Sequence, residues 1–194
     1  DHTAILGDSL EKIAYEKAGI IQENDNVLIY PANDSIVDII SNICKEKNAK
    51  LSILDENNIE IKDIGAHGNK FSFRNIDYTT KMVGQHQICN ASLALAAIFN
   101  LRSRGIIDID DKTISSALAL STWAGRLEWI RPNILLDGAH NNDGIGSLVN
   151  YLSANNFPKL KILLGILEDK DYKDMVTKLK TIPAEFSATK VPIE

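Results

Sequence analysis

The residue pair best placed for chemistry is Asp137 and His140, which are separated by a glycine and an alanine. The apolar run before them predicts a short strand over Ile134–Asp137, and a new helix is expected just after them. In parallel α/β sheets, ligands bind outside the carboxyl ends of the strands. The two side chains therefore stand where a phosphate or a ribose would be held. The alternative is that Asp137 only caps a turn or a helix.

Arg126 is the second candidate, and it follows Gly125, a residue that suits a hinge. A guanidinium group offers a fixed fork of donors that matches phosphate oxygens. The alternative is an exposed ion pair with Glu128, which would contribute little to stability.

Lys17 falls on the apolar stripe of a predicted helix that is capped by Asp8 and stops at Gly19. The stripe comprises Leu10, Ile13 and Ala14. A lysine at the next position of that stripe is either partly desolvated or extends its ammonium group past the core to water. The simpler alternative is a cation that interacts favourably with the helix dipole in the last turn.

A long helix is predicted from about His86 to Arg104, after the run Gly84-Gln85-His86-Gln87. Its first backbone N–H groups suit an anion or the polar edge of a base. The alternative is that these polar side chains only cap the helix.

Two further polar residues carry weaker signals. His2 follows Asp1, and a lone histidine is usually structural or solvated. Lys170 lies between two aspartates, after a strand predicted over Lys161–Leu167 and again at its carboxyl end. A charged loop of this kind is usually just solvated.

The elements that position these residues predict an α/β fold. Strands are expected at Val27–Tyr30 and Leu51–Leu54, around a helix that Asp34 caps and that has one apolar stripe. Ile59 to Thr80 alternates apolar and polar residues between turns, which predicts a small antiparallel β patch. A shorter helix is expected over Thr113–Leu120, capped by Asp110 or Asp111.

From Trp123 onward the pattern becomes strand, helix, strand, helix, with the helices starting near Ile145 and Tyr172. The sequence therefore predicts a βαβ unit with a buried parallel sheet that contains the two strands before Asp137 and Lys170. We expect the domain boundary at Ser121–Gly125, which divides the chain into residues 1–121 and 122–194.

Composition bounds the class of protein. The 194 residues suit one large or two small domains, and 44% hydrophobic with 24% charged residues is typical of a globular protein. A net charge of −5 gives no footprint for nucleic acid or a membrane surface. Cys44 and Cys89 form no disulfide framework or CxxC motif, which favours a reducing cytoplasm. No apolar run reaches transmembrane length, and no leader pattern is present.

Four motifs in this order resemble the folylpolyglutamate synthase/dihydrofolate synthase family, ATP-dependent ligases related to the muramyl ligases. They are Asp1-His2 with Leu6-Gly7-Asp8, Glu16-Lys17-Ala18-Gly19, Gly125-Arg126-Leu127-Glu128 and Asp137-Gly138-Ala139-His140-Asn141. The stretch Gly84 to Ala91 also matches the family. Ala124 and Asn142 stand where the family often has proline.

The resemblance implies a fold and a reaction. Residues 1–121 would be the latter part of a P-loop-type ATPase domain, and residues 122–194 a truncated Rossmann-like domain whose closure brings Arg126, Asp137 and His140 onto the nucleotide. Such enzymes phosphorylate the carboxylate of a folate, or of dihydropteroate, with ATP and Mg2+. The amine of L-glutamate then attacks the acyl phosphate to form an amide. A monomer with no nucleic-acid or membrane partner is expected.

The resemblance also implies roles for individual residues. His2 and a carbamylated Lys17 would bind the metal, and Lys17 and Arg126 would be the catalytic residues. In addition to Arg126, four residues would contact the nucleotide: Gln87, Asn90, Asp137 and His140. Lys170 would attract the anionic substrate.

No GxxxxGK[ST] phosphate-binding loop occurs in the sequence. We therefore expect the chain to be a piece of a longer protein and to be inactive as a ligase on its own. A metal-dependent phosphoesterase that uses Asp1-His2 and Asp137 with His140 is an alternative, although Thr3 replaces the second histidine that such a motif would have. A non-catalytic nucleotide-binding module is another.

Overall fold

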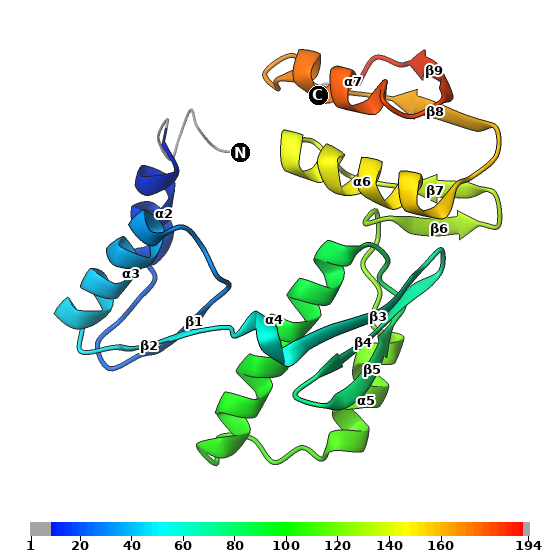
Figure 1. The fold of residues 1–194 in the computed structure, drawn as a ribbon. Helices are drawn as coiled ribbons and strands as arrows, with labels where there is room; N and C mark the ends of the chain where they lie inside the picture. Colours follow the sequence, from blue (N-terminus) through cyan, green and yellow to red (C-terminus); the bar gives the residue numbers. More distant parts are fainter. Residues whose placement is uncertain (1–8, 192–194) are drawn as a thin grey trace. The chain divides into compact units, whose positions relative to one another are not determined.

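The computed structural model describes residues 9–191, and these divide into two compact units (Figure 1). The first comprises residues 9–59 and 89–108, and the second comprises residues 60–88 and 109–191. No helix within residues 9–191 has both the length and the apolar character that crossing a membrane requires.

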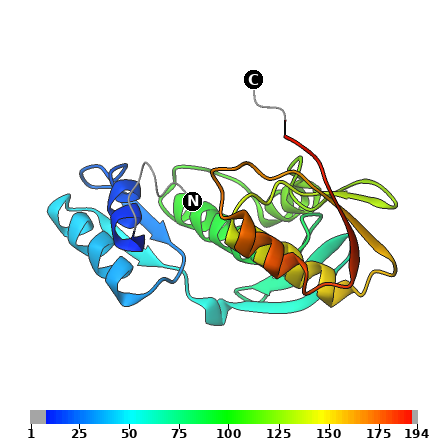
Figure 2. The same ribbon diagram turned by 90° about the horizontal axis from the view of Figure 1, so that it is seen from above.

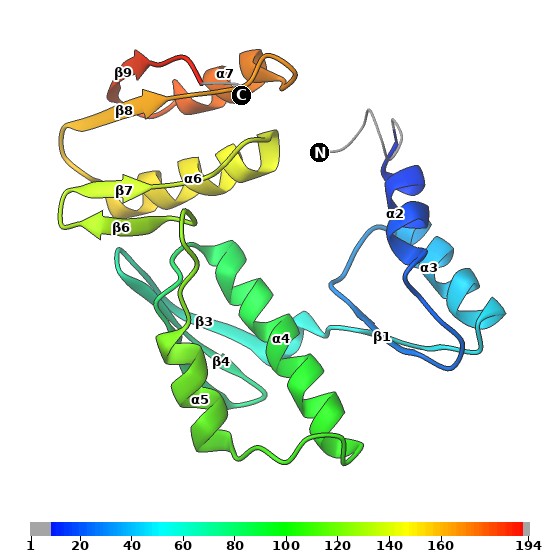
Figure 3. The same ribbon diagram turned by 180° about the vertical axis from the view of Figure 1, so that it is seen from behind.

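The first unit contains a parallel strand pair covered by helices. Strands β1 (Asn26–Ile29) and β2 (Lys50–Ile53) pair in parallel, joined by helix α3 (Asp34–Glu46). Figures 1 and 3 show α3 beside helix α2 (Leu10–Ala18), which precedes β1. A short 3-10 turn, η1 (Glu56–Asn58), follows β2. Both predicted strands are confirmed to within one residue.

The helix caps of this unit differ from the predicted ones by one position. Ser9 caps α2, with its hydroxyl accepting from the Lys12 N–H at 3.3 Å, whereas Asp8 lies outside the described residues. Asn33, not Asp34, caps α3 and accepts from the Ile36 N–H at 3.0 Å. Asp34 instead lies in the first turn, where a negative charge favours the helix dipole.

The second unit begins with the predicted β patch, which is confirmed. Strands β3 (Ile59–Gly65), β4 (Gly68–Phe73) and β5 (Ile76–Thr80) form one sheet in that order, and β4 and β5 are antiparallel. The apolar side chains that alternate along β4 and β5 are buried, among them Phe71, Phe73 and Tyr78. Ser72, between the two phenylalanines, is also buried at 4%, and Ile61 on β3 is 42% exposed, so burial follows the period-two pattern only in part.

Two helices follow the patch. Helix α4 (Gln85–Ser103) starts in the second unit and continues into the first, and Gly105 follows it with φ of +68°. Helix α5 (Asp111–Leu120) packs against β5, and its cap is Asp110, which accepts from the Thr113 N–H at 2.6 Å. Both predicted helices are confirmed.

The remainder of the second unit contains two separate strand pairs among the described residues. Strands β6 (Glu128–Arg131) and β7 (Ile134–Leu136) form an antiparallel hairpin, and helix α6 (Asn142–Asn155) follows. Strands β8 (Leu160–Leu164) and β9 (Ala184–Ala188) are parallel, with helix α7 (Tyr172–Leu179) between them. Figure 2 shows α6 and α7 alongside each other.

The predicted pairing of the two strands before Asp137 and Lys170 is wrong. Strand β7 pairs with β6, and β8 pairs with β9. A hairpin closed by a short turn brings its strands together at a low entropy cost, so the neighbouring strand becomes the partner. Neither strand pair is buried on both faces, since Leu136 on β7 and Leu163 on β8 are 49% and 69% exposed.

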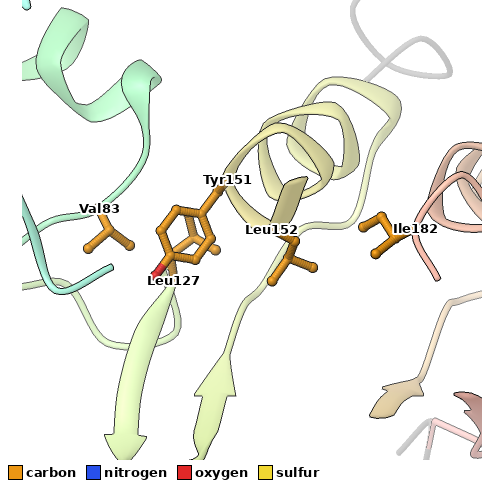
Figure 4. Packing of buried hydrophobic residues seen from close by; sticks show 5 residues of the cluster. All are labelled: Val83, Leu127, Tyr151, Leu152 and Ile182. Atoms are coloured by element: carbon orange, nitrogen blue, oxygen red, sulfur yellow. The ribbon is translucent and has the colours of Figure 1, made fainter. Parts of the chain in front are cut away.

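Buried apolar side chains hold α6 against the chain on either side of it. One cluster comprises Val83, Leu127, Tyr151, Leu152 and Ile182. Figure 4 shows Tyr151 and Leu152 projecting from α6, with Leu127 and Val83 on one side and Ile182 on the other. A second cluster, of Ile145, Met175 and Leu179, lies between α6 and α7. The first cluster contains Leu127, the residue that follows Arg126.

Candidate functional site

Two loops of the second unit come together around Arg126. One is the turn before β6, and the other is the loop between β7 and α6. The Gly138 N–H donates to the Gly125 carbonyl at 2.7 Å, and the Leu127 N–H donates to Asp137 Oδ2 at 2.8 Å. The structure thus brings Arg126 and Asp137 into neighbouring loops.

Asp137 uses both carboxylate oxygens to bind backbone. Oδ2 accepts from the Leu127 N–H, and Oδ1 accepts from the Ala139 N–H at 3.0 Å. The turn-capping alternative considered for Asp137 therefore describes its contacts in this structure. Each oxygen still has a second lone pair, so a ligand hydroxyl can bind without displacing the backbone.

The turn that carries Arg126 has an unusual backbone. Gly125 has φ of +70° and Leu127 has φ of +46°, a value that side chains other than glycine rarely adopt. Leu127 is only 4% exposed. The Arg126 side chain is exposed, so its charge faces solvent. Its backbone is held by the buried Leu127 side chain and by the bond from the Leu127 N–H to Asp137.

His140 lies one residue before the cap of α6. Its Nδ1 is 2.8 Å from the Gly138 carbonyl, which places the donating proton on that nitrogen. The following Asn141 caps α6, with its side-chain oxygen accepting from the Gly144 N–H at 2.7 Å. His140 therefore lies beside the N-terminus of a helix, where backbone N–H groups favour an anion.

The start of α4 reaches the same region. A side chain placed on Gly84 would lie 3.2 Å from Leu127 and 2.9 Å from the His86 ring. Gln87 is buried, and its amide nitrogen is 3.1 Å from His86 Nε2. The side-chain amide of Asn69, on β4, donates to the Met82 and Gly84 carbonyls at 2.8 and 3.0 Å and so fixes the loop before the helix.

The electrostatics of this region disfavour protonation of His86. Burial lowers the pKa of His86 below its ordinary value of 6.5, the nearby Asp137 carboxylate opposes that shift, and the Arg126 guanidinium reinforces it. A neutral ring can accept a hydrogen bond from the Gln87 amide.

Lys17 and Asn90 belong to the first unit, and both are exposed. Lys17 is exposed, so of the alternatives considered for it the partly desolvated amine is the one that this structure does not show. The buried residues of α2 are Ala14 and Ala18, whereas Leu10 is 60% exposed. The helix therefore turns the predicted stripe so that Lys17 faces water.

Lys170 forms an ion pair with the neighbouring Asp169 at 3.3 Å, in the loop before α7. His2 lies outside the described residues. Within residues 9–191, no three histidine, cysteine, aspartate or glutamate side chains gather as a metal site would require.

Sequence reasoning missed three residues of this region. From the sequence, Glu128 is a candidate ion-pair partner of Arg126, but in the structure its Oε2 accepts from the Gly125 N–H at 2.7 Å. Asn69 gives no signal because its contacts are distant in sequence. For His86 the sequence offers a helix cap as an alternative and no other role, and its position beside two charged residues follows from tertiary packing.

Comparisons with known proteins agree with one another. The family described as the Mur ligase middle domain matches residues 1–98. The chain is 33% identical over 193 residues to dihydrofolate synthase/folylpolyglutamate synthase of Bacillus subtilis. The matched region covers 94% of this chain and 44% of that protein.

Solved structures are similar over the same length. An FPGS–AMPPCP–folate complex is 26% identical with a TM-score of 0.82, covering 100% of this chain and 49% of that one. The folylpolyglutamate synthase of Thermotoga maritima is 28% identical with a TM-score of 0.77, covering 95% of this chain and 45% of that one. The chain thus spans a little under half the length of these relatives.

Proposed function

Because this chain belongs to the folylpolyglutamate synthase/dihydrofolate synthase family and matches the Mur ligase middle domain, we propose that its full-length parent is an ATP-dependent ligase. It joins L-glutamate to a folate through an amide bond. The observation that carries this proposal within the second unit is the exposed Arg126, held on a fixed turn that is hydrogen-bonded to the loop carrying Asp137 and His140.

The proposed reaction has two steps. A folate carboxylate oxygen attacks the γ-phosphorus of ATP, which gives an acyl phosphate and ADP. The amine of L-glutamate then attacks the acyl carbon, the amide bond forms, and inorganic phosphate leaves. Dihydropteroate, with the same carboxylate chemistry, is an alternative acceptor.

Arg126 acts in the first step. Charge spreads over the γ-phosphate oxygens as the phosphoryl group transfers, and a preorganised guanidinium stabilises that charge more than it stabilises the bound substrate. An exposed side chain on a rigid backbone suits this role, because little reorganisation is needed when the nucleotide binds.

The other proposed nucleotide contacts come from polar side chains on the loop after β7 and on α4. Asp137 accepts a ribose hydroxyl with its remaining lone pairs, and His140 lies beside a helix N-terminus that favours a phosphate. Gln87 and Asn90, one turn apart on α4, contact the base or the ribose.

The metal-binding part of the proposal rests on the family resemblance. Mg2+ bound with the nucleotide would supply positive charge that neutralises the phosphates. His2 and Lys17 as a carbamate are the proposed protein ligands, and an exposed lysine at the end of α2 is accessible to carbon dioxide. Lys170 attracts the anionic folate as a minor contribution.

The proposed domain organisation follows the same resemblance. Residues 1–121 form the latter part of the central ATPase domain, and residues 122–194 belong to a Rossmann-like domain. The parallel β1–β2 and β8–β9 pairs, each with a crossover helix, are consistent with α/β domains of this kind.

The test is ADP release by the purified full-length parent with Mg2+, a folate and L-glutamate. We expect ADP release to require both the folate and L-glutamate, and the product to be heavier than the folate by one glutamyl residue. Equal ATP turnover without L-glutamate would reject the ligase and leave a nucleotide-binding or hydrolytic module.

A further inference from the structure

The turn that carries Arg126 is held by an unusually complete set of hydrogen bonds. The Gly125 N–H donates to Glu128 Oε2 at 2.7 Å, and the Arg126 N–H donates to the Trp123 carbonyl at 3.2 Å. The Leu127 N–H donates to Asp137 Oδ2 at 2.8 Å. Every backbone N–H from Gly125 to Leu127 therefore has a partner, and two of the three partners are carboxylates.

The backbone of this turn would not hold its shape unaided. Leu127 sits at φ of +46°, in the left-handed region, which disfavours a residue with a Cβ. Its buried side chain and the bond to Asp137 keep it there. Strained residues of this kind persist only where their surroundings fix them, and they gather at functional sites.

Gly125 presents the opposite problem. It has φ of +70°, and nothing lies within 4 Å of the place where a side chain would be. A glycine in open space has many accessible conformations. Two hydrogen bonds remove that freedom: the Gly125 N–H donates to Glu128, and the Gly138 N–H donates to the Gly125 carbonyl. They fix the residue before Arg126, whereas the apolar core fixes Leu127 after it.

We infer that Glu128 and Asp137 are a pair of positioning residues that hold the turn at its two ends and so aim the Arg126 guanidinium. This inference rests on the proposed function of Arg126. Glu128 touches no substrate in this account and acts through Arg126, while Asp137 adds positioning to its proposed contact with the nucleotide. Both carboxylates are used for their acceptor oxygens, since charged acceptors make the stronger bonds to backbone N–H groups.

The test is a double-mutant cycle in the full-length parent, with Glu128→Ala, Arg126→Ala and the double variant. We expect Glu128→Ala to lower kcat about 10- to 100-fold, as loss of a supporting residue commonly does. In the Arg126→Ala background the same change should lower kcat less than about 2-fold, since the residue it positions is gone. Glu128→Gln keeps an acceptor oxygen and should recover much of the activity.

The matched control is Glu185→Ala. Glu185 is an exposed glutamate whose ion pair with Lys161 has both side chains 77% exposed, so its loss should leave kcat unchanged. An equal fold-loss from Glu128→Ala in both backgrounds would make Glu128 a general structural residue and overturn the inference. An unchanged kcat in Glu128→Ala would also overturn it.

A second measurement reads the turn without relying on activity. Amide hydrogen exchange at residues 125–127 should become faster in Glu128→Ala and remain as in wild type in Arg126→Ala. Unchanged exchange in Glu128→Ala would reject the positioning role even if the parent proved not to be a ligase. If the wild-type parent showed no ligase activity but exchange was faster in Glu128→Ala, only the proposed function would be rejected.

Discussion

At the scale of single residues, Arg126 combines an exposed side chain with a backbone that is fixed by its neighbours. Its side chain is exposed, whereas the residue that follows it is buried in the core. The backbone of the turn therefore depends on packing that the guanidinium does not share. A change of the side chain alone should leave the fold intact and remove only its proposed interaction with phosphate.

We predict that Arg126→Ala in the full-length parent lowers kcat with little change in stability. The expected loss is about 2–4 kcal/mol of transition-state stabilisation, by analogy with removing one preorganised donor. Steady-state kinetics and a thermal melt measure the two quantities. Arg131→Ala, which removes another exposed arginine on β6, is the control and should change neither. A lower melting temperature with normal turnover in Arg126→Ala would make that residue structural.

Lys17 illustrates how periodicity can leave the environment of a residue open. The stripe through Leu10 and Ala14 allows either a partly desolvated amine or one that reaches water, and the helix buries Ala14 and Ala18 and exposes both Leu10 and Lys17. Periodicity alone cannot fix which face of a short helix is buried. A helix of nine residues has few apolar positions, and faces that differ by a small rotation match them about equally well. The carbamate at Lys17 now rests on the family resemblance alone.

At the scale of elements, α6 is connected to the turn between β3 and β4 by a small polar network. The Ala66 carbonyl accepts from Tyr151 Oη at 2.6 Å and from Trp129 Nε1 at 2.7 Å. Tyr151 is 2% exposed, and the Phe157 ring lies 5.9 Å from its ring. This network ties the small β patch to α6 and β6 within the second unit.

We predict that Tyr151→Phe destabilises the full-length parent by about 1 kcal/mol, the net value of one buried hydrogen bond. The loss stays small because Trp129 still donates to the Ala66 carbonyl. Denaturant unfolding measures the change. Tyr172→Phe removes the hydroxyl of a tyrosine that is 46% exposed and should have no effect. Equal stabilities for Tyr151→Phe and wild type would show that the network contributes nothing.

The start of α4 should respond to pH through His86. Its pKa is lowered by burial, so the unfolded chain binds a proton more readily than the folded one. The stability that the neutral ring provides is complete above the unfolded value of 6.5 and declines as the pH falls through the lower folded pKa. We predict that His86→Asn loses less of its melting temperature than wild type between about pH 7.5 and about pH 5.5.

His140→Asn, which removes an exposed histidine instead, is the matched variant and should keep the wild-type response. The same acid-induced loss of melting temperature in His86→Asn and in wild type would show that another group is responsible.

The elements show where sequence patterns suffice. Helices α4 and α5, the parallel strands of the first unit and the β patch follow from local periodicity and caps, and their bounds are close to those predicted. Strands β6 and β9 were not predicted, and the pairing of β7 was wrong. Pairing is a tertiary choice among strands of similar pattern, so a single sequence cannot decide it.

The site shows the same division. Its motifs could be read from the sequence, because Arg126, Asp137 and His140 follow turns and strand ends. The bonds from Gly125 to Glu128 and from Leu127 to Asp137 could not, since they depend on a left-handed turn that no local pattern marks. Burial of His86 beside two charged side chains likewise arises only from packing.

At the scale of the whole molecule, the chain spans 44% of the length of its Bacillus subtilis relative. Its sequence contains no GxxxxGK[ST] loop to hold the β- and γ-phosphates. We predict that the 194-residue chain alone shows no ATP turnover that depends on L-glutamate. A coupled ADP assay against a boiled sample measures it, and turnover above that sample would contradict the prediction.

We propose above all that the parent activates a folate carboxylate as an acyl phosphate. The most direct measurement uses a folate whose reacting carboxylate carries 18O, with ATP, Mg2+ and L-glutamate, and analyses the inorganic phosphate by mass spectrometry. The account predicts that each phosphate released carries one 18O atom, because the carboxylate oxygen that attacks the γ-phosphorus leaves with it. Unlabelled phosphate formed at the rate of ATP turnover would contradict the account, since it would show that water and not the folate attacks the nucleotide.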